Sequence, residues 1–206
     1  MTEGGIVKVQ KERKKITTKT LVTMKQRGEK ITALTAYDFL MARYLDEAGI
    51  DFILVGDSLG NVIQGNATTL TVTLDEIIYH AKIVKKAVKT ALLVVDLPFM
   101  SYHVDLRESV RNCGRVMKET GADAVKLEGG ERIAEVVKHL VKAGIPVMGH
   151  LGLTPQSINI FGTYVTRGTD PKEARMIQRD AKILEQAGCF GIVLEKIPAS
   201  LAKKIT

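Results

Sequence analysis

Long apolar runs and cysteines are both scarce in this sequence, and each scarcity excludes a class of protein. No apolar stretch approaches the ~20 residues of a membrane-spanning helix, and no apolar segment follows the basic N-terminus as it does in a signal peptide. Only two cysteines are present, Cys113 and Cys189, and they lack the spacing of a metal site. We therefore expect a cytoplasmic protein with reduced thiols and no membrane partner.

Nucleotide-binding signatures are missing as well. The segment GDSLG (56–60) does not match the GxGxxG loop that binds dinucleotides, and GHLGLTPQS (149–157) does not match a phosphate-binding P-loop. The sequence therefore gives no reason to expect a nucleotide cofactor.

An excess of positive charge is present only at the N-terminus. Residues 1–30 contain nine Lys/Arg and three Asp/Glu, which accounts for most of the net charge of +7. We predict that residues 1–17 form a basic arm, whose charges are solvated as is usual at a chain terminus. Nucleic-acid binding by this arm is a remote alternative, because the arm has no interleaved aromatic residues and no recognition motif.

A short apolar run that ends in a polar residue and a turn recurs along the chain, and helical patterns lie between the copies. This alternation predicts parallel strands joined by helical crossovers, either closed as a (β/α)8 barrel or open with helices on both faces. The six predicted strands are 31–38, 53–60, 91–99, 123–130, 145–155 and 190–198, and the predicted helices are 18–28, 39–49, 73–89, 106–121, 131–144 and 171–188.

Several residues mark where these helices begin and end. Thr73 and Glu76 form a capping box, Asp105 and Asp170 are predicted N-caps, and Pro171 fits the first helical position. Four predicted helices stop at a glycine, as expected for a left-handed C-terminal cap: Gly49, Gly121, Gly144 and Gly188.

Polar side chains at the carboxyl ends of the predicted strands are the candidates for a site. In both architectures these ends face one crevice, where ligands bind. The candidates are Asp57, Asp96, Glu128, His150 and Glu195.

Three of these candidates are carboxylates on successive strands. Asp57, Asp96 and Glu128 would repel one another and raise one another's pKa values unless a cation lies between them. All-oxygen ligation without cysteine favours Mg²⁺ over zinc. The alternative is that each acid separately caps a loop or lies at the surface.

The neighbouring polar residues each allow two interpretations. Lys126 could bind a substrate carboxylate or enolate oxygen, or form a cross-strand ion pair. Ser58 could bind substrate or cap the following turn, and His150 could be a base or a hydrogen-bonded core residue. Glu195 ends an apolar strand, where burial is expected to raise its pKa toward the range of a general base.

Seven motifs occur in order along the chain: TAYD (35–38), LVGDSLG (54–60), the segment from Gln64 to Thr73, DLPFM (96–100), VKLEGG (125–130), GHLGLTPQSINIFG (149–162) and VLEKIP (193–198). Together, over about residues 18–206, they closely resemble the ketopantoate hydroxymethyltransferase family.

The resemblance implies a (β/α)8 barrel of which this chain contains about six βα units, so that residues 18–206 would form a catalytic domain that is incomplete at its C-terminal side. It also implies transfer of a hydroxymethyl group from 5,10-methylenetetrahydrofolate to 3-methyl-2-oxobutanoate. The product would be 2-dehydropantoate, an intermediate of pantothenate and coenzyme A biosynthesis, formed through a Mg²⁺-stabilised enolate. The family further implies a cytoplasmic homo-oligomer, an octamer or decamer.

The resemblance assigns roles to the candidate residues. It implies that Asp57, Asp96 and Glu128 surround Mg²⁺ and that Glu195 accepts the proton. The residues implied to bind the keto acid or line its site are Asp57, Ser58, Asp96, Lys126 and His150.

A second family would suit much of this pattern. Enzymes of the phosphoenolpyruvate mutase and isocitrate lyase group are also Mg²⁺-dependent barrels that act on keto-acid enolates. Isocitrate lyase would need a cysteine motif that neither Cys113 nor Cys189 supplies. This group is therefore the second interpretation of the sequence and not the first.

Overall fold

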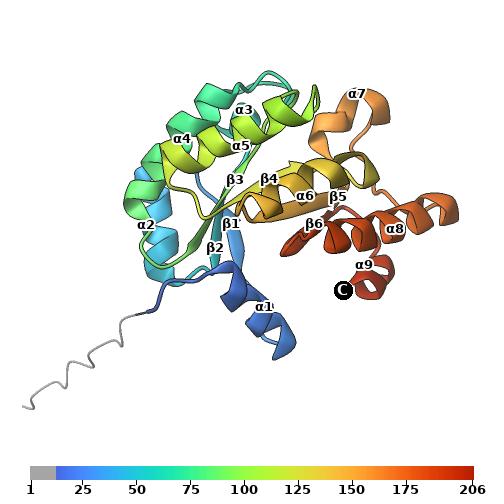
Figure 1. Ribbon diagram of the computed structural model, residues 1–206, viewed down its shortest axis with the longest axis horizontal. Coiled ribbons are helices and arrows are strands. Elements are labelled where there is room, and N and C mark those ends of the chain that lie inside the picture. The colour runs from blue at the N-terminus through green and yellow to red at the C-terminus, as the bar shows by residue number, and fades with distance from the viewer. Residues whose placement is uncertain (1–12) are drawn as a thin grey trace, which may run out of the picture.

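In the part of the chain that the structure describes, six parallel strands form one curved sheet, in which they follow one another in sequence order (Figure 1). The computed structural model describes residues 13–206, so most of the predicted basic arm lies outside the described residues. This sequential order differs from that of a doubly wound sheet, where the strand order reverses. The described strands make a half-barrel: β1 Ala33–Thr35, β2 Phe52–Val55, β3 Leu92–Asp96, β4 Ala124–Glu128, β5 Val147–Gly152 and β6 Gly191–Glu195.

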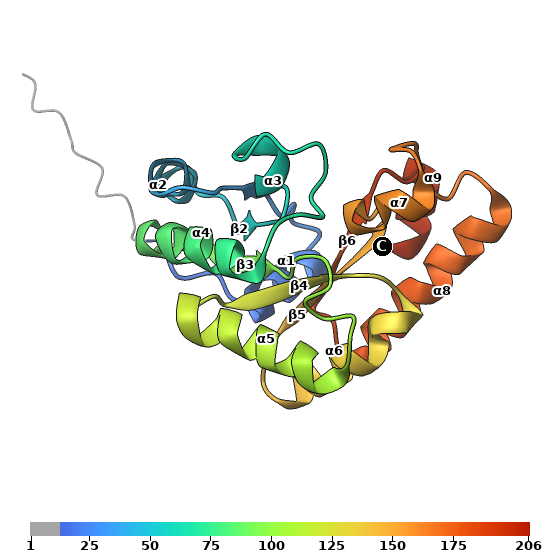
Figure 2. The ribbon, with the colours of Figure 1, turned by 90° about the horizontal axis from the view of Figure 1, so that it is seen from above.

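The long helices cover only the convex face of the sheet. In Figure 2, α4, α5, α6 and α8 follow one another around the outside of the strands, and each contacts the next. The long helices are α2 Phe39–Ala48, α4 Leu74–Ala87, α5 Leu106–Thr120, α6 Ala134–Lys142 and α8 Pro171–Ala187. Shorter ones are α1 Thr18–Gln26, α3 Leu59–Val62, α7 Ile158–Phe161 and α9 Ala199–Ile205, with 3₁₀ turns η1 Glu131–Ile133 and η2 Pro155–Ser157.

The predicted caps explain where the long helices begin. The Thr73 hydroxyl accepts from Glu76 N, and the Glu76 carboxylate accepts from Thr73 N at 2.7 Å, which completes the capping box. Asp105 and Asp170 also accept hydrogen bonds from the first turns of α5 and α8. The N-terminal predictions are therefore confirmed.

The C-terminal glycine caps follow the prediction at all four helices. Gly49, Gly121 and Gly188 adopt the left-handed conformation directly after α2, α5 and α8. Helix α6 ends at Lys142, and Gly144, with φ 85°, closes it in the same way: Gly144 N donates to Val141 O and Ile145 N donates to Leu140 O.

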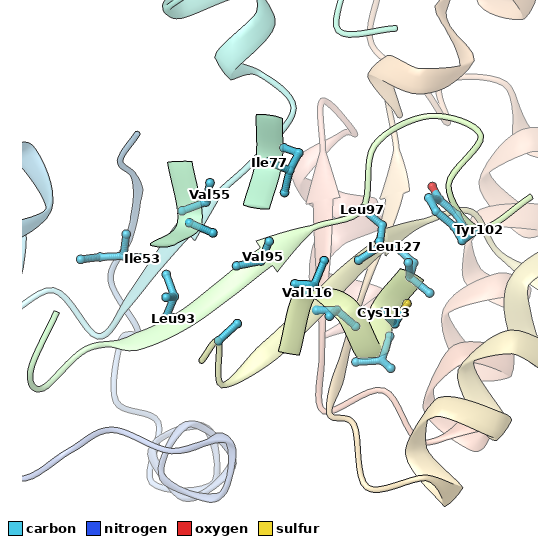
Figure 3. Close-up of a cluster of buried hydrophobic side chains, with 14 of the residues drawn as sticks. Ile53, Val55, Ile77, Leu93, Val95, Leu97, Tyr102, Cys113, Val116 and Leu127 are labelled. Atoms are coloured by element: carbon cyan, nitrogen blue, oxygen red, sulfur yellow. The ribbon is translucent and has the colours of Figure 1, made fainter. Parts of the chain in front are cut away.

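The main core lies between the sheet and the outer helices. Side chains of alternate strand residues meet Ile77 of α4 and Cys113 and Val116 of α5 in one buried cluster (Figure 3). Burying each such aliphatic side chain contributes about 1.5–3 kcal/mol. The labelled strand residues in that cluster are Ile53, Val55, Leu93, Val95 and Leu127.

A smaller core fills the concave face and is closed by the N-terminal segment. Ile16 and Leu21 are buried against Leu92, Val94 and other inward-facing strand residues. Helix α1 thus lies at the end of the strands opposite α3 and α7 (Figure 1). It covers the amino-terminal end of the half-barrel and leaves the carboxyl end to the site.

The part of the predicted arm that the structure describes is held against the half-barrel. Arg13 donates to Asp51 at 2.6 Å, and Lys15 donates to Asp123 at 2.7 Å and to the carbonyl of Ala91 at 2.6 Å. All three acceptors directly precede strands, so these contacts lie at the amino ends. Residues 13–17 therefore contact the body, and the division at residue 17 stays a prediction.

The two outer strands are less buried than the four between them. All of β1 is exposed and all of β6 is half-buried, whereas β3 and β4 are buried throughout. The burial expected for Glu195 at the end of its apolar strand is wrong for the described structure, because β6 pairs there only with β5 and the Glu195 side chain is 39% exposed. Among residues 13–206, every helix is too short or too polar to cross a bilayer.

Candidate active site

Strand alternation places five polar side chains on the concave face, above its apolar layer. Leu92 and Val94 of β3 point inward, so Asp96 does too, and on β4 the inward residues are Ala124, Lys126 and Glu128. Register then sets the neighbours: Asp96 is opposite Lys126, and Glu128 is opposite His150. Glu195 on β6 lies opposite Gly152.

Asp57 and Ser58 enter the site from the turn after β2. Gly56 makes room for them, because a Cβ there would lie 3.2 Å from Ser58 Oγ and 3.6 Å from Asp96 Oδ2. Ser58 precedes α3 but its side chain makes no capping bond. Its hydroxyl instead pairs with the Tyr37 hydroxyl at 2.7 Å, so it does not cap the turn in the way that the sequence allowed.

The three carboxylates converge in the interior. One ligand oxygen each from Asp57, Asp96 and Glu128 lies within 4.8 Å of the others. Their exposed fractions are 3%, 2% and 1%. The surface alternative for these acids is therefore wrong.

Lys126 is the cation that the structure places among these acids. Its Nζ lies 2.7 Å from Asp96 Oδ2 and 3.9 Å from Glu128 Oε1, and the side chain is buried. The cross-strand ion pair allowed by the sequence is thus formed. One lysine cannot balance three carboxylates, so the group retains negative charge unless protons or a cation bind.

The pKa values reflect that imbalance. Burial raises the pKa of Asp96 to about 8, although Lys126 opposes the shift, and Asp57 and Glu128 add to it. Burial likewise raises the pKa of Asp57. Burial lowers the pKa of Lys126, but the nearby carboxylates outweigh this and hold that pKa above its ordinary value.

These residues fit a hard divalent cation. Among the described residues the buried Asp96 Oδ1 atom finds no hydrogen-bond partner, while Oδ2 is taken by Lys126. A buried carboxylate oxygen without a partner is costly, and a cation held jointly with Asp57 and Glu128 would satisfy it. The all-oxygen donor set suits Mg²⁺.

His150 lies between two carboxylates. Its Nδ1 is 3.2 Å from Glu128 Oε1, and its Nε2 is 3.3 Å from Glu195 Oε2 without the alignment of a hydrogen bond. Burial and Lys126 lower the pKa of His150, but Glu128 and Glu195 raise it more, so it lies above its ordinary value. Lys126 Nζ also lies 3.2 Å from His150 Nδ1, so the ring is held between one ammonium and two carboxylates.

Glu195 reaches the site at its open edge. Its side chain is 39% exposed, in contrast to the 4% of His150. Gly152 allows the end of β6 to lie close to β5. It has φ 90°, and a Cβ at this position would collide with the Glu195 carbonyl. A side chain at position 152 would push β6 away and move Glu195 with it.

All seven residues predicted from the sequence are therefore brought to one place, five of them buried, with Ser58 half-buried and Glu195 at the rim. Sequence reasoning missed Gln156, Tyr102 and Tyr37, which hydrogen-bond to these residues. Tyr37 and Gln156 lie inside quoted motifs, but nothing in a single sequence shows where their side chains point.

Comparison with known proteins agrees with this geometry. The sequence pattern of a family described as ketopantoate hydroxymethyltransferase matches residues 15–206. A 3-methyl-2-oxobutanoate hydroxymethyltransferase of Flavobacterium johnsoniae is 60% identical over 195 residues, covering 95% of this chain and 72% of that protein. One from Bacteroides fragilis is 59% identical over 192 residues, covering 93% and 70%.

Solved structures with a similar fold are more distant in sequence. A phosphonopyruvate hydrolase has a TM-score of 0.67 at 13% identity, covering 88% of this chain, which spans 63% of that one. A 2,3-dimethylmalate lyase, a member of the PEP mutase/isocitrate lyase superfamily, has a TM-score of 0.64 at 16% identity, covering 91% and 67%. At such low identity these structures establish the fold alone.

Proposed function

Because the chain belongs to the ketopantoate hydroxymethyltransferase family, we propose that it is a 3-methyl-2-oxobutanoate hydroxymethyltransferase of pantothenate biosynthesis. It takes a one-carbon unit from 5,10-methylenetetrahydrofolate and forms 2-dehydropantoate. The observation that carries the proposal is the buried trio Asp57, Asp96 and Glu128 beside Lys126, found in a chain about 60% identical to enzymes of that name.

Asp57, Asp96 and Glu128 would hold Mg²⁺. When bound, Mg²⁺ acts as a Lewis acid that polarises the keto oxygen of the substrate and makes its C3 proton more acidic. The partnerless Oδ1 of Asp96 supports this assignment.

Lys126 and Ser58 bind and orient the keto acid. Asp96 keeps Lys126 charged, so the Nζ protons can stabilise negative charge that develops on the substrate oxygen. The Ser58 hydroxyl, held by Tyr37 at 2.7 Å, offers a further contact to the substrate. Both groups are preorganised by the fold before substrate arrives.

Glu195 accepts the C3 proton on its carboxylate. It is the acid of the site that lies at the rim, outside the buried trio, and the His150 imidazole at 3.3 Å steadies its negative charge. The deprotonated C3 then attacks the methylene carbon. Water supplies the hydroxyl group, and tetrahydrofolate leaves.

The alternative function draws no extra support from the fold. The superfamily of the 2,3-dimethylmalate lyase shares the half-barrel, but the chain is only 16% identical to that enzyme. Neither cysteine is near an exposed reactive position, since Cys113 is buried and burial raises the pKa of both thiols to about 12. The nucleic-acid alternative concerns the arm, most of which lies outside the described residues.

Further parts of the proposal concern the whole enzyme. A (β/α)8 barrel requires two βα units beyond the six described, and the sequential parallel order supports it.

An octameric or decameric assembly is supported by apolar side chains of α2, Leu40, Met41 and Tyr44, which are about half exposed. Two unpaired cysteines support a cytoplasmic location. Native mass spectrometry would give the number of subunits directly.

The activity is tested by supplying 3-methyl-2-oxobutanoate, 5,10-methylenetetrahydrofolate and Mg²⁺, and measuring 2-dehydropantoate by mass spectrometry. We expect product that disappears with a chelator and returns with added Mg²⁺. Formation of product in excess chelator would contradict the metal assignment, and no product under any metal condition would contradict the function.

A further inference from the structure

Gln156 is given no role in the proposed reaction, yet its side chain and its backbone contact two of the three carboxylates. It comes from η2, the 3₁₀ turn after β5, and is 5% exposed. Its Nε2 donates to Asp57 Oδ2 at 2.8 Å and to the carbonyl of Leu97 at 2.9 Å. Leu97 directly follows Asp96, so one amide connects the segments that carry two of the three acids.

The other end of Gln156 reaches the third acid. Its backbone N–H donates to Glu128 Oε2 at 3.1 Å, and its Oε1 accepts from the Tyr102 hydroxyl at 2.7 Å. That hydroxyl in turn accepts from the backbone N–H of Glu128 at 3.0 Å. Gln156 and Tyr102 together therefore hold Glu128 at both its side chain and its backbone.

This arrangement requires an amide in one orientation. Both Nε2 protons meet acceptors and Oε1 meets a donor, so a flipped amide would set an oxygen against the Asp57 carboxylate and the Leu97 carbonyl. Neither an apolar nor an acidic side chain could replace it. A buried amide whose two protons and oxygen are all hydrogen-bonded is held in one orientation.

The network also gives one oxygen of each carboxylate a hydrogen-bond or ion-pair partner. Gln156 occupies Asp57 Oδ2 and Glu128 Oε2, and Lys126 occupies Asp96 Oδ2. Glu128 Oε1 lies 3.2 Å from His150 Nδ1, whereas Asp96 Oδ1 has no hydrogen-bond partner among the residues that the structure describes. Mg²⁺ demands near-ideal octahedral geometry, whereas Ca²⁺ accepts flexible arrangements, so the placement of these oxygens bears on which cation binds.

We propose that Gln156, supported by Tyr102, is the positioning residue of the metal site, which fixes Asp57 and Glu128 for ligation and sets the preference for Mg²⁺ over Ca²⁺. The inference rests on the Mg²⁺ site of the proposed function. It extends that function to a residue that would act through Asp57 and Glu128, the two acids it contacts.

The test is calorimetric titration of the protein with Mg²⁺ and, separately, with Ca²⁺, without substrate. Gln156→Met keeps the side-chain length and removes the amide, and we expect a ~10–100-fold loss of Mg²⁺ affinity with a smaller loss for Ca²⁺. Tyr102→Phe keeps the ring and removes the hydroxyl, with an expected loss of about 3- to 10-fold for Mg²⁺. Gln186→Met, at an exposed position of α8, is the matched control and should change neither affinity.

The outcomes separate positioning from a general loss of structure. Equal losses for Mg²⁺ and Ca²⁺ in Gln156→Met, or unchanged Mg²⁺ affinity, would overturn the proposal. If Gln156→Met fails to fold, Tyr102→Phe decides, and its wild-type Mg²⁺ affinity would overturn the proposal equally. A wild-type protein that binds neither cation would instead contradict the metal site itself.

Discussion

Asp96 combines three roles in one side chain. It ends β3, it pairs through Oδ2 with Lys126 at 2.7 Å, and it leaves Oδ1 buried without a partner. Burial first, and then the neighbouring acids, raise its pKa to about 8 despite Lys126. A group this strongly disfavoured in its charged form is one that a bound cation would stabilise.

Replacing Asp96 with Asn should weaken Mg²⁺ binding by at least about tenfold, because the amide keeps the shape and loses the charge. Titration calorimetry measures this, with Asp75→Asn as the control, since the Asp75 side chain is 81% exposed on α4. Mg²⁺ affinity equal to that of the wild type would show that Asp96 is not a ligand.

At the level of residues, the sequence predicted those that end strands and missed those that support them. Asp57, Asp96, Glu128 and His150 could be grouped because the carboxyl ends of parallel strands meet. The support from Gln156 spans 99 residues to Asp57 and depends on the path of a loop. Such a path is set by tertiary packing, which no local pattern encodes.

A buried acid at the opposite end of the sheet, Asp46, joins a helix to the segment that precedes a strand. Asp46 of α2 is 7% exposed and accepts from the backbone N–H groups of Lys89, Thr90 and Ala91, which precede β3. Burial raises the pKa of Asp46, but these hydrogen bonds outweigh it and hold the pKa below its ordinary value. Asp46 therefore fixes α2 to the next βα unit.

Asp46→Asn should lower the free energy of unfolding by about 1–3 kcal/mol at pH 7, because an amide cannot accept all these bonds. Since the folded-state pKa lies below 3.8, the contribution of Asp46 is present above pH 3.8 and is lost as the pH falls through the folded-state value. Urea unfolding should thus show a difference between wild type and variant that shrinks in acid.

The control for Asp46 is Glu47→Gln, since the Glu47 side chain is 66% exposed and should contribute little. A difference between Asp46→Asn and the wild type that stays constant from pH 7 down to pH 3 would mean that the ionised carboxylate is not responsible.

Element boundaries followed the sequence where caps exist and departed from it where helices are short. The long helices α4, α5 and α8 begin directly after their predicted N-caps, Thr73, Asp105 and Asp170. Helices α3 and α7 have four residues each, too few for a periodic pattern to show. Both lie in loops that follow strands at the carboxyl ends, where the site is.

For the whole molecule, alternating strands and helices could not decide between a closed barrel and an open sheet. Both are built from the same βα units, and only the order of strands separates them. The resemblance to a family favoured the barrel, and the observed order from β1 to β6 forms a half-barrel with stability contacts at one end and the polar site at the other.

That separation of the two ends gives a prediction for the N-terminal segment. Removing both Arg13 and Lys15 by substitution with Ala should cost about 1–3 kcal/mol of unfolding free energy, because their bonds to Asp51 and Asp123 are lost. The affinity for 3-methyl-2-oxobutanoate should not change, as these contacts lie at the amino ends of the strands. Lys14→Ala, at an exposed position between them, is the control. A large loss of keto-acid affinity in the folded double variant would show that the two ends are coupled.

The central claim is that the carboxyl ends of the strands form a site that removes the C3 proton of 3-methyl-2-oxobutanoate, with Glu195 as the base. The most direct measurement is deuterium wash-in at C3, followed by NMR, with Mg²⁺ and without folate. Glu195→Gln keeps the size of the side chain, so it should still bind the keto acid but exchange ~10²–10⁴-fold more slowly than the wild type. Exchange at the wild-type rate in the Gln variant would contradict the account, and His150, 3.3 Å away, would become the candidate base.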